Sequence, residues 1–113
     1  MRIALVAVLA LVCAVPDAHA RVRRHHKLPW CGIYMGQYFG KHDRRLWRAR
    51  EWAREGDNAG GPGVGVVVVW PHHVGVIVGR DASGEWMVHS GNDGGAVRTR
   101  ARSLGGVIAY RRL

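Results

Sequence analysis

The stretch GVGVVVVWPHHVGVIVGR, residues 63–80, contains a long run of β-branched residues. Such a run is typical of a strand that is buried on both faces, and it predicts a strand over residues 64–70. Pro71 and His72 then form a turn, since proline has no backbone N–H to offer a central strand. A second strand is predicted from His73 to Arg80. This antiparallel pair is the predicted centre of the fold.

On the C-terminal side of this pair, turn residues and strand residues alternate. Residues 81–84 predict a hairpin turn, and residues 85–90 predict the strand that returns from it. A glycine-rich turn at 91–95, a short strand at 96–100 and a last strand at 106–111 follow. The sequence therefore predicts an antiparallel sheet of about five strands.

On the N-terminal side, the segment from Cys31 to Phe39 predicts a helix. One face carries apolar or aromatic residues at helical spacing, namely Cys31, Tyr34, Met35 and Tyr38. Gly32 and Gly36 lie four residues apart, so they form a flat ridge that another element can approach closely. Gly40 is expected to end the helix.

A second helix is predicted from Arg44 to Glu55, with Asp43 as its N-terminal cap and Gly56 as its end. Its apolar stripe consists of Leu46, Ala49, Trp52 and Ala53. The residues from 57 to 63 are expected to form a loop. Helices followed by antiparallel strands predict an α+β fold.

Cys31 stands at the predicted start of the first helix and is a candidate nucleophile. A helix N-terminus and a nearby imidazolium lower the pKa of a thiol from about 8.5 to roughly 3.5–7.5. His73, at the start of a strand, can supply that imidazolium and later give a proton to a leaving amine. We therefore expect Cys31 to have a lowered pKa and His73 to lie beside it.

A third residue is expected to hold the imidazole. A hairpin closed over residues 81–84 allows two registers, which place His73 opposite Gly91 or Asn92. Asn92 can accept a hydrogen bond from the ring and hold its tautomer, although an asparagine here also suits a plain turn. His89 is the alternative, because the first register places it on the same face as His73. The register favours Asn92.

No metal or cofactor is expected. His25 and His26 are neighbours near the N-terminus, but no closed set of ligands accompanies them. Cys31, His73 and His89 are residue types that bind zinc, yet their spacing matches no zinc signature.

Residues 1–20 have the pattern of a signal peptide. A positive start precedes an apolar run over residues 3–15, and Ala18-His19-Ala20 has small residues at the cleavage positions. The run of about 13 residues is shorter than the roughly 20 that span a bilayer. We expect cleavage before Arg21 and release into the periplasm or the medium. Removal of 20 of the 113 residues leaves 93, which suit a basic arm at 21–28 and one monomeric domain at 29–113.

Cysteine use and charge narrow the function further. Cys13 leaves with the leader, so Cys31 is a lone thiol in an exported chain, where cysteines are usually paired. The net charge is +9, and the leader contains one arginine and one aspartate, so its removal leaves that charge unchanged. Such a charge attracts anionic polymers, and export makes acidic lipid or cell wall a better partner than nucleic acid.

Six segments, taken in order, resemble a CHAP domain, the cysteine, histidine-dependent amidohydrolase/peptidase family. They are residues 29–32 (PWCG), 63–70 (GVGVVVVW), 73–79 (HVGVIVG), 90–92 (SGN), 96–98 (AVR) and 107–111 (VIAYR). The resemblance covers nearly all of the chain after the leader.

The resemblance implies a papain-like fold and cleavage of amide bonds in peptidoglycan, as an N-acetylmuramoyl-L-alanine amidase or a peptide endopeptidase. It implies that Cys31 is the nucleophile, His73 the base and Asn92 the polar third residue. The chain departs from the family at two places. Many relatives have an acidic residue where Val66 stands, and another shortly before the asparagine, where this chain has His89 and Ser90.

Two classes of function follow. The first is an exported cysteine hydrolase that acts on peptidoglycan, and the ordered Cys31, His73 and Asn92 favour it. The second is a non-catalytic cationic envelope protein that binds cell wall or anionic lipid, which the small size and the arginine content also suit.

Overall fold

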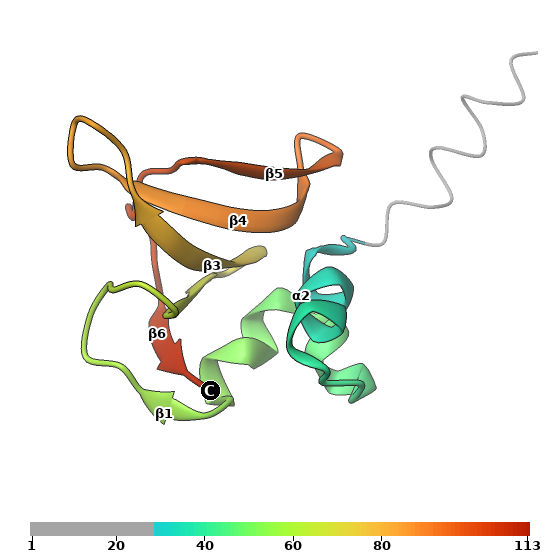
Figure 1. Ribbon diagram of the computed structural model, residues 1–113. Coiled ribbons are helices and arrows are strands. Elements are labelled where there is room, and N and C mark those ends of the chain that lie inside the picture. The colour runs from blue at the N-terminus through green and yellow to red at the C-terminus, as the bar shows by residue number, and fades with distance from the viewer. Residues whose placement is uncertain (1–28) are drawn as a thin grey trace, which may run out of the picture.

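The sheet is built around the predicted central hairpin (Figure 1). The computed structural model describes residues 29–113, so the expected leader, the basic arm and His25-His26 lie outside the described residues. The helical elements are the α-helix α2 (Cys31–Phe39) and the 3-10 helices η1 (Arg44–Trp47) and η2 (Ala49–Arg54). The strands are β1 (Asp57–Asn58), β2 (Val67–Trp70), β3 (His73–Arg80), β4 (Trp86–Asp93), β5 (Ala96–Ala101) and β6 (Ala109–Arg112). No helix in this part of the chain is long and apolar enough to cross a membrane.

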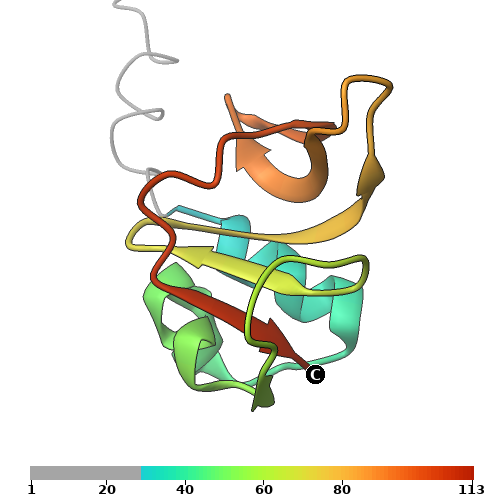
Figure 2. The same cartoon turned by 90° about the vertical axis from the view of Figure 1, so that its left-hand side faces the viewer.

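The strands form an antiparallel sheet in the order β1-β6-β2-β3-β4-β5. Strands β2 and β3 pair directly, with Trp70 opposite His73 and Val67 opposite Val76. The C-terminal strand β6 lies between β1 and β2, as Figure 2 shows. The predicted α+β class, with N-terminal helices on an antiparallel sheet, is therefore confirmed.

Both faces of the central strands are buried. On one face, the sheet packs against α2, η1 and η2 through Cys31, Met35, Leu46, Ala49, Trp52, Val67, Val69, Val74 and Val76. On the other face lies a smaller cluster of Val68, Trp70, Ile77 and Val88, against which Trp86, Leu104, Val107 and Tyr110 pack. Alternate residues of β2 thus enter the two clusters, as expected of a strand without a polar face.

The predicted helix from Arg44 to Glu55 is wrong in kind. It is two 3-10 segments separated at Arg48, whose backbone is extended (φ −90°, ψ 122°). The Leu46 carbonyl accepts a hydrogen bond from the indole Nε1 of Trp52 at 2.7 Å instead of closing a helical turn. The capping role of Asp43 is confirmed, since its side chain accepts a hydrogen bond from the backbone N–H of Arg45. This hydrogen bond thus overrides the helical pattern. Of the predicted stripe, Leu46, Ala49 and Trp52 are buried and Ala53 is partly buried.

Several strand limits also differ from the prediction. Strand β2 begins at Val67 rather than residue 64, because Gly65 adopts a positive φ of 84° and turns the chain. Strand β4 continues to Asp93, past the predicted end at residue 90. The last strand begins at Ala109 rather than residue 106. The segment that is expected to be a loop contains one further short strand, β1, which pairs with β6.

The glycine ridge predicted on α2 is where the helix meets η1 and the chain segment that follows the helix. A Cβ at Gly32 would lie 2.7 Å from the carbonyl oxygen of Trp47, and closer still to that of Leu46. A Cβ at Gly36 would lie 2.5 Å from the carbonyl oxygen of Lys41. Both neighbours are backbone atoms, so neither can yield by changing a rotamer.

We expect Gly32→Ala to lower the free energy of unfolding by about 1 kcal/mol. Overpacking costs about 1–3 kcal/mol, which exceeds the roughly 1 kcal/mol that alanine gains as a helix former. Gly79→Ala is the control, because a Cβ there meets nothing within 4 Å. Urea unfolding followed by circular dichroism measures both variants. A Gly32→Ala protein as stable as Gly79→Ala would contradict the prediction.

Candidate active site

Cys31 is the first residue of α2, and its side chain is completely buried. The thiol lies 3.9 Å from the backbone carbonyl oxygen of His72. The backbone N–H of Val74 also acts on the sulfur and favours its anionic form. The thiol therefore lies against the backbone on both sides of His73. Among residues 29–113, however, no hydrogen bond joins it to the His73 ring.

Burial raises the pKa of the Cys31 thiol above its ordinary value. The backbone N–H groups of Val74, Gly32 and Cys31, together with the charge of Arg102, act in the opposite direction without offsetting it. The expected lowering by the helix start is thus present but smaller than the effect of desolvation. The prediction of a lowered pKa is wrong for this conformation, and the resting thiol is protonated at neutral pH.

His73 opens β3 and is also buried, with 9% of its surface exposed. Its Nε2 lies 2.9 Å from the hydroxyl oxygen of Ser90, and its ring packs against Trp70 with 5.8 Å between the centroids. Burial lowers the pKa of His73 to about 4, helped by the charges of Arg102 and Arg100 and opposed by Asp93. The imidazole is therefore neutral at pH 7, so the pair holds no thiolate and imidazolium at rest.

The structure places Ser90, not Asn92, at the His73 ring. Pairing of Val76 with His89 corresponds to the second of the two predicted registers, in which His73 counts as opposite Asn92. The backbone at Asn92 has a φ of 53°, and the β4–β5 pairing shifts between Ser90 and Asp93. Ser90 reaches the ring as the diagonal neighbour in the antiparallel pair. No hydrogen bond between the side chains of Asn92 and His73 occurs in the described part of the chain.

Gly75 explains why a serine fits at this place. Any Cβ on Gly75 would lie 3.0 Å from the Cβ of Ser90 and 2.6 Å from a methyl group of Val88. The missing side chain lets β4 approach β3 where Ser90 meets His73. Two sequence signals point to Ser90: the diagonal offset, and its place in the region where many CHAP domains, which the sequence resembles, have an acidic residue.

His89, the alternative third residue, has other partners. Its Nε2 lies 2.6 Å from the hydroxyl of Tyr34, and its Nδ1 lies 2.7 Å from the hydroxyl of Thr99. Both ring nitrogens are thereby engaged on the side of the sheet that faces α2, and the role of orienting His73 is not available to His89. Nor do residues 29–113 contain a group of three side chains placed to hold a metal ion.

Asp93 is a part of the site that the sequence prediction missed. Only 3% of its surface is exposed, and it accepts hydrogen bonds from Nε of Arg100 at 2.6 Å and from Arg102 at 3.1 Å. Although burial alone raises the pKa of Asp93, these two arginines hold it below its ordinary value. Arg102 also lies over the ring of Trp70, 4.9 Å from its centroid. The sequence signal for this cluster is the alternation of arginines at 98, 100 and 102, because alternate residues of a strand lie on the same face.

These contacts place the His73 imidazole and the Ser90 hydroxyl together on the face of the sheet that carries Trp70 and Val88. The Cys31 thiol lies in the cluster on the other face, which packs against α2, and it meets the backbone beside His73 rather than the ring. Comparison with known proteins finds no match for the chain among protein-family models, curated proteins or solved structures. The resemblance to CHAP domains therefore rests on the residues quoted above.

The lowered pKa of His73 makes stability depend on pH. Because the folded protein binds this proton less readily than the unfolded chain, the stability is complete above pH 6.5 and falls as the pH drops from 6.5 toward about 4. The loss amounts to at most about 3 kcal/mol, since one pKa unit corresponds to about 1.4 kcal/mol. His73→Gln keeps a polar group for Ser90 but does not titrate, so its stability should fall less over this range. Urea unfolding at pH 7 and pH 4.5 measures both, and equal losses would contradict the prediction.

Proposed function

We propose that the chain is an exported cysteine hydrolase that cleaves amide bonds of peptidoglycan, as an N-acetylmuramoyl-L-alanine amidase or a peptide endopeptidase. The observation that supports it most directly is the position of the Cys31 sulfur, at the first residue of α2 and against the backbone on both sides of His73. The order of residues that resembles a CHAP domain supports the same conclusion. The leader expected at residues 1–20 would bring the protein to its substrate.

In this proposal, His73 acts as a general base rather than as half of a preformed ion pair. Ser90 holds Nε2, and Nδ1 has no hydrogen-bond partner among residues 29–113. The proposal therefore assigns the thiol proton to Nδ1, which requires the ring to approach the sulfur. The sulfur attacks the carbonyl carbon of the amide as that proton leaves, and the imidazolium gives the proton to the departing amine. Water, activated by the same nitrogen, then hydrolyses the thioester and restores the thiol.

The charge that develops on the carbonyl oxygen needs donors that are already in place. The backbone N–H groups of Cys31 and Gly32 lie near the sulfur and favour its thiolate form. A helix start presents such groups without internal partners. They are the candidate donors to the oxyanion.

A second candidate function is a non-catalytic envelope protein that binds the wall through its charge. The observations that favour it are the complete burial of Cys31 and the raised pKa of its thiol, which are usual for a structural cysteine. The net charge of +9 supplies the attraction.

Digestion of purified peptidoglycan separates the two candidates. The wild-type protein should release soluble fragments, and mass spectrometry of their ends identifies the bond that is cut. Cys31→Ala should release none while keeping the wild-type circular dichroism spectrum, because it removes the nucleophile and only one sulfur atom from the core. If wild type and Cys31→Ala both sediment with the wall at low salt, dissociate at high salt and release nothing, the second function is correct.

The position of Ser90 predicts its effect on turnover. Ser90→Ala should lower kcat by about tenfold or more with little change in KM, because the ring loses the group that orients it for the transition state. Asn92→Ala should have a smaller effect, and His89→Ala should be mildest of the three. Steady-state kinetics on a soluble fragment of peptidoglycan measures them. A larger loss in Asn92→Ala than in Ser90→Ala would assign the orienting role to Asn92, as the resemblance implies.

A further inference from the structure

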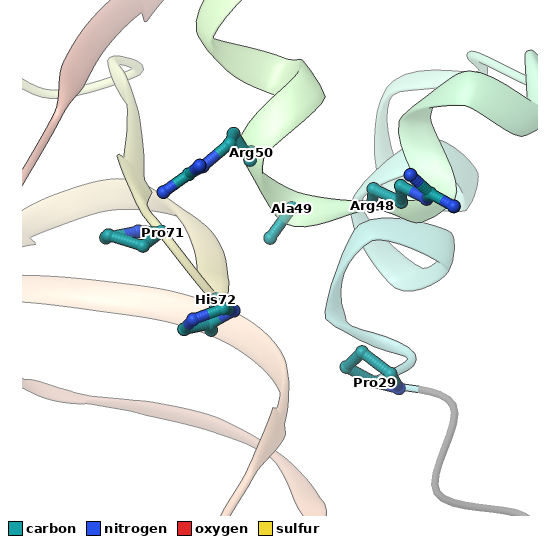
Figure 3. Close-up of a pocket in the computed structure, with 6 residues that line it drawn as sticks. All are labelled: Pro29, Arg48, Ala49, Arg50, Pro71 and His72. Atoms are coloured by element: carbon teal, nitrogen blue, oxygen red, sulfur yellow. The ribbon is translucent and has the colours of Figure 1, made fainter.

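A cavity of about 250 Å³ lies near the candidate nucleophile, which is not itself one of the lining residues. It is lined by Pro29, Arg48, Ala49, Arg50, Pro71 and His72 (Figure 3). Two of these connect it to Cys31: Pro29 precedes the thiol by two residues, and the carbonyl group of His72 is the one that the thiol contacts. A group bound in this cavity would therefore lie close to the backbone that the sulfur contacts.

The walls of the cavity are apolar and its charged groups are basic. Pro29, Ala49 and Pro71 supply the apolar surface. The methyl group of Ala49 points into the space between Pro29 and Pro71 (Figure 3). The Arg50 side chain extends toward Pro71, whereas Arg48 points away from the cavity (Figure 3). No acidic residue is among the lining residues.

The positive charge at the cavity is not neutralised by the protein in the part that the structure describes. Arg45, in the same helical region, forms ion pairs with Asp43, Glu51 and Glu55. Arg48 and Arg50 have no such carboxylate partner among residues 29–113. The carboxylates of this region are thus gathered around Arg45, and Arg50 remains available to a ligand.

We propose that this cavity is a subsite for a carboxylate group on the substrate peptide, next to the amide bond that is cut, with Arg50 as its main partner. The inference rests on the proposed function and adds the chemical class that the site selects. A guanidinium binds a carboxylate through two parallel hydrogen bonds, and the proline and alanine walls suit the short aliphatic part of an acidic residue. Residues 21–27, which precede the cavity in the sequence, are basic, so charge does not favour them as its occupant.

The test uses two ligands that differ only in this carboxylate, with the Cys31→Ala protein so that neither is consumed. They are N-acetylmuramoyl-L-alanyl-D-glutamate and the same compound with its α-carboxylate amidated, as D-isoglutamine. Calorimetry should show at least about tenfold tighter binding of the acid, because the amide cannot form the charge-assisted hydrogen bonds that the carboxylate forms with the guanidinium. Adding Arg50→Gln should remove that preference. Arg54→Gln is the matched control, because Arg54 lies in η2 but does not line the cavity.

Equal binding of the two compounds, or a preference that survives Arg50→Gln, overturns the subsite. If an equal concentration of inorganic phosphate displaces the acid, the cavity is a general anion site and not a carboxylate subsite. The proposed function is judged separately, by digestion of peptidoglycan with the wild-type protein. A retained preference without digestion would support the subsite and reject the hydrolase.

Discussion

The start of α2 packs so closely against η1 and β4 that only glycine fits at two of the contact positions, and the candidate site depends on this close packing. Gly32 faces the backbone carbonyls of η1, and Gly91 of β4 faces α2, where a Cβ would lie 2.8 Å from the ring of Trp30. These two contacts hold the first turn of the helix between η1 and β4, so that the Cys31 sulfur meets the backbone at β3. A methyl group at either glycine would separate the thiol from the strand that bears the imidazole.

Desolvation is the strongest electrostatic effect at the site. It raises the pKa of Cys31 despite the helix start, and it lowers the pKa of His73 despite the carboxylate of Asp93. Both groups are therefore neutral at rest. In the proposed hydrolysis, charge would be created only when the substrate carbonyl and the backbone N–H groups are in contact. The arginines bonded to Asp93 keep the region positive, which favours an anion over a cation in the course of any such step.

The sequence predicts best where the local pattern and the tertiary structure agree. The run of valines and the turn at Pro71 predict the central hairpin, and the length of the 81–84 turn limits the β3–β4 register to two possibilities. The helix prediction fails at Arg48, because the indole of Trp52 donates to the carbonyl of Leu46, which an α-helix would use for a backbone hydrogen bond. Ser90 was passed over for a related reason: counting opposite residues ignores the diagonal reach that Gly75 permits. Asp93 is predicted as a turn residue because the glycines around it dominate the local pattern, whereas its partners Arg100 and Arg102 lie seven and nine residues further along the chain.

The order of the strands has a consequence for how the chain folds. Strands β3, β4 and β5 follow one another and pair with their neighbours in sequence, so they are the fast part of the sheet. Strand β6 must instead travel back to pair with β2, where Val67 meets Arg111. Until it arrives, the valines of β2 present an open edge to other chains, the kind of segment from which aggregates grow. The strand that closes this edge carries Arg111 and Arg112, and the excess positive charge of the whole chain keeps partly folded molecules apart during the delay.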